Sequence, residues 1–228
     1  MEASSVGPTP GHEAGAVRPT PPREANVTPA AAEQRYVTAP ITANPAALGL
    51  TGFALSTFIL SMFNARLVNV GGTPILFGLI LFYGGVAQFL AGMWEFRTGN
   101  TFGATTFGSY GAFWLALWAL DTLYLKHIPM TALGSTLALY LFAWAGFTTL
   151  LFLAALRTTG AVAVTVLLLV VTEVVLGFGY NNADVTTLKW GGYLGIATAA
   201  GAWYTAFAIL LESTFNRWIL PVFPLARE

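Results

Sequence analysis

The sequence contains no cysteine and few charged residues. Lys and Arg number ten, Asp and Glu number ten, and together they make up 9% of the 228 positions. Soluble domains usually carry roughly 25% charged residues. Because cysteine is absent, disulfide bridges, thiolate metal sites and cysteine nucleophiles are excluded. The formal net charge of zero gives no electrostatic reason to expect nucleic acid as a partner.

Histidine is almost as scarce, which argues against several classes of membrane enzyme. The two histidines are His12 and His127, and no cluster of His, Asp and Glu has the spacing of metal ligands. A retinal protein needs a lysine within a membrane helix, whereas Lys126 and Lys189 lie at the ends of apolar segments. An intramembrane serine protease usually pairs its serine with a buried histidine. We therefore expect no enzymatic activity, no metal and no other cofactor.

Apolar sequence is abundant instead. Hydrophobic residues make up 56% of the chain, and from Pro45 onward apolar segments of roughly 20 residues alternate with short polar breaks. At about 1.5 Å per residue, each segment can cross a hydrocarbon layer of about 30 Å. The sequence thus predicts an all-α integral membrane protein with six transmembrane helices. The expected spans cover residues 46–63, 74–94, 104–124, 132–156, 161–180 and 190–211.

The first 43 residues differ in composition from the remainder. Eight of the twelve prolines lie before Ala46, and Tyr36 is the one aromatic residue in that segment. Such a segment cannot bury a core. We predict a disordered cytoplasmic tail over 1–43, the transmembrane domain over 44–215, and a short cytoplasmic tail over 216–228. The N-terminus lacks the features of a cleavable signal peptide, so the first span is expected to serve as the insertion signal.

The basic residues predict that both termini face the cytoplasm, because positively charged connections tend to remain on that side. With the tail inside, seven basic residues are cytoplasmic and three are outside; without the two arginines far from the first span, the ratio is five to three. The inside set is Arg18, Arg23, Arg35, Arg97, Arg157, Arg217 and Arg227, and the outside set is Arg66, Lys126 and Lys189.

The segment before and within the first span has a distinctive composition. Asn44 is a good helix N-cap, and Pro45 suits the first helical position because its missing N–H would be idle there. As a whole, the segment resembles the signature Asn-Pro-Ala-Pro-Leu-Gly-Leu of the acetate uptake transporter family, from which it departs at Ala47. The matching residues are Asn44, Pro45, Ala46, Leu48, Gly49 and Leu50, followed by Thr51, Gly52 and Phe53.

Further segments resemble the same family, which includes bacterial succinate-acetate permeases and their fungal relatives. The likeness runs in order from residue 44 to about residue 224, and the long N-terminal tail is similar to that of the fungal members. The family implies six-helix protomers assembled as hexamers in the plasma membrane, each with its own pathway, that couple acetate, other monocarboxylates or succinate to protons. The segments are residues 82–92, Glu95 with 99–103, and then 109–114, 202–204 and 220–222.

The resemblance also implies a hydrophobic waist formed by a Phe, a Tyr and a Leu from three helices. Phe53 and Tyr110 correspond to the first two. The third falls in the fifth span, where we place it at Val171, with a slip of one or two residues among Leu167, Leu168, Leu169 and Val170 as the alternative.

An apolar waist has its own physical consequence. Removing water from a carboxylate costs several kcal/mol or more, so such a neck favours the protonated acid or hydrogen-bond donors at its rims. For each polar candidate, hydrogen bonding between helices is an equal alternative to substrate contact. The candidates are Asn44, Gln88, Asn100, Thr101, Ser109 and Tyr110.

Glu173 lies well inside the fifth apolar run, and a carboxyl group there is costly enough to suggest a function. It is absent from the family pattern. We weigh it equally as a proton carrier and as a structural residue that bonds Ser or Thr or faces a neighbouring protomer. Glu95, beside Arg97 at the end of a span, is expected to form a boundary ion pair.

Three functions from different classes follow from the sequence. The first is a monocarboxylate transporter or acetate-selective channel, which the ordered motifs favour. The second is an exporter of ammonium or ammonia, whose cation would need stacked aromatic rings and acidic vestibules. The third is a sensory or structural membrane protein whose motifs serve assembly.

Overall fold

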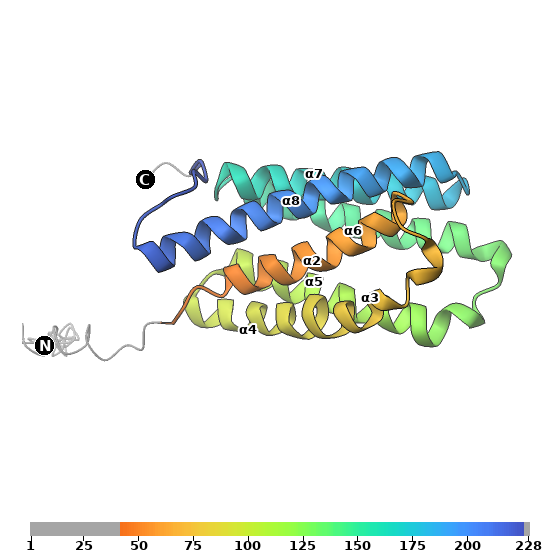
Figure 1. The fold of residues 1–228 in the computed structure, drawn as a ribbon, viewed down its shortest axis with the longest axis horizontal. Coiled ribbons are helices and arrows are strands. Elements are labelled where there is room, and N and C mark those ends of the chain that lie inside the picture. The colour runs from red at the N-terminus through yellow and green to blue at the C-terminus, as the bar shows by residue number, and fades with distance from the viewer. Residues whose placement is uncertain (1–41, 226–228) are drawn as a thin grey trace, which may run out of the picture. The chain divides into compact units, whose positions relative to one another are not determined.

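Six antiparallel helical rods form a bundle in the computed structural model, which describes residues 42–225 (Figure 1). Because their number is even, α2 begins and α8 ends at the same end of the bundle. The rods are α2 (Ala46–Asn64); α3 (Ile75–Leu79) continued by the π-helical η2 (Ile80–Ala87) and α4 (Gln88–Thr98); α5 (Thr101–Ala119) continued by η3 (Leu120–Tyr124); α6 (Met130–Ala155); α7 (Gly160–Asn181); and α8 (Val185–Phe215). Two 3-10 turns, η1 (Val70–Gly72) and η4 (Leu125–His127), lie in the connections.

The six predicted segments are confirmed as helices, with shifted ends. Five rods are long and apolar enough, by length and composition, to cross a membrane. The rod that begins with α5 is the exception, since Thr101, Thr105, Thr106 and Ser109 dilute its apolar residues. The largest difference in length concerns α8, whose 31 residues extend the expected span 190–211 at both ends.

The polar breaks between spans begin helices, and at α2 the cap lies one residue later than the sequence predicts, with Pro45 at the N-cap position and Ala46 as the first helical residue. The side chain of Asn44 accepts a hydrogen bond from the Ala46 nitrogen at 2.9 Å, and that of Asn100 accepts one from the Gly103 nitrogen at 3.0 Å at the start of α5. Asp184 caps α8 in the same way; the Thr187 hydroxyl, and then backbone N–H groups, hold the pKa of this carboxyl below its ordinary value. These caps satisfy backbone donors that a helix start leaves unpaired.

Glycine sets the distance between several rods, most clearly between α4 and α5. A Cβ atom on Gly111 would lie 2.6 Å from the Phe89 nitrogen, and one on Gly92 would meet the backbone of Gly108. Backbone atoms cannot swing aside as side chains do. The two helices therefore touch through their backbones, which is how small residues bring helices together in lipid.

We expect Gly92→Ala to destabilise the bundle and Gly146→Ala to leave it intact. Both glycines lie inside helices, where alanine is intrinsically favoured by up to about 1 kcal/mol. Gly146 has open space around it, so only that gain applies. At Gly92 the new methyl group meets backbone, and overpacking of this kind costs about 1–3 kcal/mol. Thermal unfolding of both variants in the same detergent measures the difference; equal midpoints would contradict the close approach.

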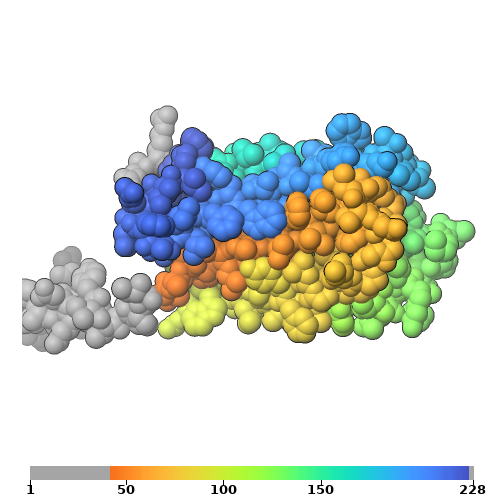
Figure 2. Space-filling view, in the orientation of Figure 1, coloured from red at the N-terminus to blue at the C-terminus, as the bar shows by residue number. Residues whose placement is uncertain are grey.

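The segment after α8 folds back onto the bundle. The Gly160 nitrogen donates to the Phe223 oxygen at 2.7 Å, and the Tyr204 hydroxyl donates to the Pro221 oxygen at 2.6 Å. The space-filling view shows this segment over one end of the molecule, with α2 lying between α8 and α4 on the same face (Figure 2). Residues 216–225 of the predicted C-terminal tail thus belong to the packed structure. The predicted N-terminal tail, except residues 42 and 43, lies outside the described residues.

Candidate functional site

Three cavities follow one another along α2, α5 and α7. The first, which we call the Asn44 cavity, has a volume of about 270 Å³ at the end where α2 begins. The second, the neck, has a volume of about 40 Å³ near the middle of the helices. The third, the Arg66 cavity, has a volume of about 350 Å³ at the opposite end. Side chains from all three helices line each cavity, in the order in which the helices run.

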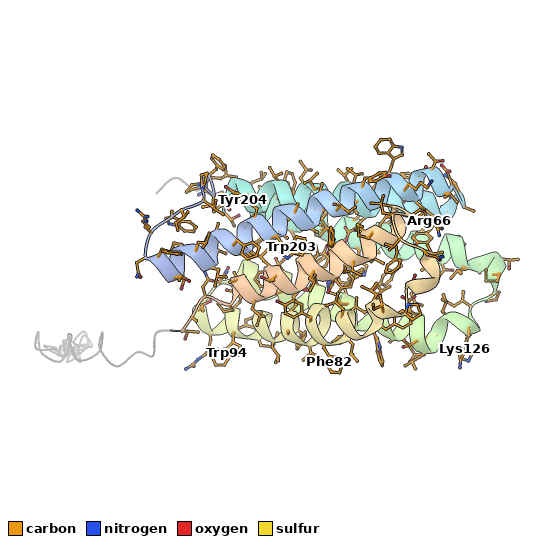
Figure 3. All side chains as sticks on the ribbon, in the orientation of Figure 1. Arg66, Phe82, Trp94, Lys126, Trp203 and Tyr204 are labelled. Carbon is orange, nitrogen blue, oxygen red and sulfur yellow. The ribbon has the colours of Figure 1, made fainter. Side chains whose placement is uncertain are left out.

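The ends of this series differ in charge. Among the described residues, Arg66 and Asp121 are the charged side chains that line the cavities, and both lie on the Arg66 cavity. Figure 3 shows Arg66 and Lys126 at that end of the bundle, with Trp94 and Tyr204 towards the other. The Asn44 cavity offers neutral polar groups only, including Asn44, and its wall includes Trp218 from the segment that folds back.

The neck brings together the two residues that the sequence assigned to a waist. Phe53 of α2 and Tyr110 of α5 are buried and line the same small space. Their ring centroids lie 5.5 Å apart at 73°, an edge-to-face contact. The volume of about 40 Å³ is close to the roughly 30 Å³ that one water molecule occupies in the liquid. The bundle is therefore closed to a hydrated ion at this level.

Aromatic rings seal the neck from the Arg66 cavity. Phe113 lines that cavity and contacts Tyr110, with ring centroids 5.9 Å apart. Trp144 of α6 packs against both rings, at 5.4 Å from Tyr110 and 5.0 Å from Phe113. Tyr140 stacks on Phe113 at 5.9 Å. A solute that passes between the two cavities must displace part of this group.

Leu169 lines the neck in this structure, and Val171, the residue predicted for the third waist position, does not. Leu169 is buried and lines the neck with Phe53 and Tyr110, whereas Val171 is 39% exposed and lines none of the cavities. Two positions along an α-helix differ by about 200° in direction. The two side chains therefore point to nearly opposite faces of α7, and the candidate moves to Leu169, one of the alternatives considered from the sequence.

Two polar atoms at the neck lack partners. The Oε1 atom of Gln88 and the Oγ1 atom of Thr106 are buried, and neither has a hydrogen-bond partner within residues 42–225. Both side chains line the neck. Buried polar atoms are nearly always paired, and an unpaired one costs about 1–3 kcal/mol. The pair therefore offers an acceptor and a hydroxyl to a small polar solute.

The other predicted polar residues fall in different places. Asn44 and Asn100 line the Asn44 cavity, where their side-chain oxygens also cap α2 and α5. Thr101 is exposed and lines none of the three cavities. Ser109 lies in a groove between α5 and α6, beside Trp144 and outside the series. Thus Gln88 and Tyr110 are the polar candidates from the sequence that reach the neck.

Glu173 lies inside the protomer, 4% exposed. Its Oε1 atom accepts a hydrogen bond from the Tyr110 hydroxyl at 3.0 Å. That hydroxyl also bonds the Thr148 hydroxyl of α6. The structure thus points Glu173 at the neck tyrosine and not at the outer surface of the bundle.

The expected ion pair of Glu95 with Arg97 is absent from the described part of the chain. Glu95 is 1% exposed, and its Oε2 atom accepts a hydrogen bond from the Thr98 hydroxyl at 3.1 Å, whereas Arg97 is exposed. Positions two apart on a helix, such as 95 and 97, point away from each other. Glu95 is therefore a buried group near the start of α5.

Sequence reasoning missed several residues of the neck. Thr106, Phe107, Leu151, Thr165 and Val166 all line it. Helical spacing gives a signal for some of them, because Thr106 precedes Tyr110 by four positions on the same face of α5. Thr165 stands in the same relation to Leu169 on α7.

Comparison with known proteins places this arrangement in a family. The model of the GPR1/FUN34/yaaH family matches residues 26–227. A solved structure described as the bacterial acetate channel SatP superposes with a TM-score of 0.74 at 33% sequence identity, covering 79% of this chain and 99% of that one.

Curated relatives show the same pattern. Acetate permease A of Emericella nidulans is 37% identical over 195 residues, 79% of this chain and 65% of the relative. Ammonia transport outward protein 2 of Saccharomyces cerevisiae is 40% identical over 171 residues, which cover 73% of this chain and 61% of the relative. The succinate-acetate/proton symporter SatP of Escherichia coli is 35% identical over 180 residues, which cover 79% of this chain and 95% of the relative. The chain thus spans slightly less than two thirds of the two fungal relatives.

Proposed function

Because the chain belongs to the GPR1/FUN34/yaaH family of multi-pass membrane proteins, we propose that it moves acetate and similar small monocarboxylates across a membrane. The pathway runs from the Asn44 cavity through the neck to the Arg66 cavity. All three cavities lie within one chain, so each protomer has its own pathway. Assembly as a homo-hexamer, which the family resemblance implies, stays a prediction.

The unpaired oxygens of the neck are the observation that carries this proposal. A carboxylic acid presents one O–H donor and one carbonyl acceptor. The donor suits the Oε1 atom of Gln88, and the carbonyl suits the hydroxyl of Thr106, both unpaired among the described residues and both lining the neck. A monocarboxylic acid would therefore replace the hydrogen bonds that each group lacks.

The apolar remainder of the neck selects the form of the substrate. Phe53, Leu151, Val166 and Leu169 surround the two oxygens, and no basic side chain of residues 42–225 lines this space. An ionised carboxylate loses several kcal/mol or more on leaving water without a paired cation. The neutral acid loses much less, so we propose that acetic acid is the species that crosses the neck.

Uptake of labelled acetate into liposomes that contain the purified full chain tests the proposal. An inward proton gradient should accelerate uptake over that of protein-free liposomes of the same lipid. Acetate uptake no faster than in protein-free liposomes, by a folded protein, would contradict the proposal.

Export of ammonium or ammonia is the second candidate, and one observation favours it. Ammonia transport outward protein 2 is 40% identical to the matched region. Against it, no carboxylate from the described part of the chain lines the neck, and Glu173 contacts Tyr110 without lining the neck itself. The same liposomes loaded with ammonium decide between the two: ammonium flux that acetate does not inhibit would favour the second candidate.

We propose that the chain lies in the plasma membrane with both termini in the cytoplasm. Arg97, Arg157 and Arg217 lie at the end of the bundle where α2 begins, and Arg66, Lys126 and Lys189 lie at the other. The basic residues among the described positions are therefore equal in number at the two ends of the bundle. The predicted excess of cytoplasmic basic residues comes from the arginines near the two ends of the sequence. A glycosylation acceptor fused to the C-terminus should stay unmodified. If the acceptor is glycosylated, the C-terminus faces outward and the proposed orientation is wrong.

A further inference from the structure

Glu173 belongs to a chain of hydrogen bonds that links three helices. Its Oε1 atom contacts the Tyr110 hydroxyl at 3.0 Å, and that hydroxyl contacts the Thr148 hydroxyl. Thr148 in turn donates to the carbonyl oxygen of Trp144 at 2.8 Å. The chain therefore contains three contacts in series, from α7 through α5 to α6.

The number of hydrogens in this chain depends on the protonation of Glu173. When Glu173 is protonated, it can donate to Tyr110, Tyr110 to Thr148, and Thr148 to Trp144, so each contact holds one hydrogen. When Glu173 is ionised, two hydrogens remain, and the Tyr110 hydroxyl turns to donate to the carboxylate. The chain accommodates both forms by rotating hydroxyl groups, without moving a helix.

No cation fixes Glu173 in its ionised form. Residues 42–225 contain no basic side chain in contact with it, and its Oε2 atom has no hydrogen-bond partner there. The titratable groups that face it are Tyr110 of α5 and Tyr140 of α6, and α8, packed along the same helix, contributes none. A structural ion pair therefore does not explain a carboxyl group at this position.

Tyr110 connects the neck with Glu173. Glu173 and Thr148 line none of the three cavities, whereas Tyr110 lines the neck and donates a hydrogen bond to Glu173. Tyr110 is therefore the member of this chain through which Glu173 can exchange a proton with the neck.

We propose that Glu173 holds the proton that accompanies the substrate and exchanges it with the neck through the Tyr110 hydroxyl, which the bond to Thr148 orients. The inference rests on the proposed transport of carboxylic acids. It makes Glu173 a coupling residue that acts through Tyr110, and it gives Thr148 a role that packing alone would not require.

The exchange balances as two linked proton transfers. The proton of a protonated Glu173 moves from its Oε1 atom to the Tyr110 oxygen. At the same time the proton of Tyr110 moves to the oxygen of a substrate carboxylate that arrives at the neck. The products are the neutral substrate acid, neutral Tyr110 and ionised Glu173. The reverse transfer restores the substrate carboxylate and the protonated Glu173.

Two modes of transport by the full chain in liposomes separate this role from a structural one. Net uptake of labelled acetate down a proton gradient requires release of the proton. Counterflow, the exchange of external labelled acetate for internal unlabelled acetate at equal pH, requires no net proton movement. Glu173→Gln keeps the shape and the hydrogen bonds but cannot release a proton. We expect it to lower net uptake on the order of ten-fold more than it lowers counterflow.

Matched variants complete the test. Glu95→Gln removes another buried carboxyl group outside the relay, and the ratio of net uptake to counterflow should match the parent. Glu173→Asp retains a proton site and should restore part of the ratio. An unchanged ratio in Glu173→Gln, or equal losses of both modes, would overturn the inference.

If Glu173→Gln does not fold, Thr148→Val removes the hydroxyl that orients Tyr110 at nearly constant volume. A lowered ratio of net uptake to counterflow supports the inference and an unchanged one overturns it. Absence of acetate flux in the parent would instead refute the proposed function itself, so the two failures are distinguishable.

Discussion

Replacing Phe53 by alanine is expected to admit longer and dicarboxylic acids such as butyrate and succinate. The ring of Phe53 forms one wall of a space of about 40 Å³. Its removal therefore enlarges a neck that has room for about one water molecule. Discrimination between substrates that differ by one methylene group in an apolar pocket is worth about ten-fold or more. We expect the preference for acetate to fall by at least about that factor, measured by competition of each acid against labelled acetate uptake.

Phe58→Ala provides the matched control on the same helix. Phe58 packs against Trp203 of α8, with ring centroids 5.2 Å apart, and lines none of the three cavities. Its removal also deletes a ring from α2, but from a partly buried position away from the neck. The two variants should differ in substrate range only. Unchanged preference in folded Phe53→Ala would place the constriction elsewhere.

Hydrophobic segment length was sufficient to predict the fold, because a helix that crosses lipid must satisfy its own backbone groups. The six segments, and the start of α2 directly after Asn44 and Pro45, follow from local sequence. Helix ends were less well predicted, as α8 shows: its first turn is fixed by the Asp184 cap and not by hydropathy.

The site was predictable only where a motif fixed the helical phase. Phe53 and Tyr110 lie in distinctive strings, and both reach the neck. The fifth span is a run of Leu and Val in which every face looks alike, so Val171 and Leu169 could not be distinguished. The partner of Glu173 was equally out of reach, because α5 and α7 are far apart in sequence and meet only in the folded bundle.

The choice between Leu169 and Val171 gives the second large effect. Leu169→Ala should widen the neck, because the side chain is buried beside Phe53 and Tyr110. We expect faster uptake of propionate and butyrate relative to acetate, by about ten-fold. Val171→Ala removes a smaller, 39% exposed side chain from the opposite face of α7 and should transport with the selectivity of the parent.

The pair of variants also separates widening from general loosening of α7. Both replace an aliphatic side chain by alanine, two positions apart on one helix, so a change in helix propensity is nearly common to both. Comparable surface abundance with a changed substrate range in Leu169→Ala alone assigns the third wall of the neck. A changed range in Val171→Ala with none in Leu169→Ala would mean that α7 is rotated by nearly half a turn from the orientation described. That rotation would also carry Glu173 away from Tyr110, so the same two variants bear on the proton relay.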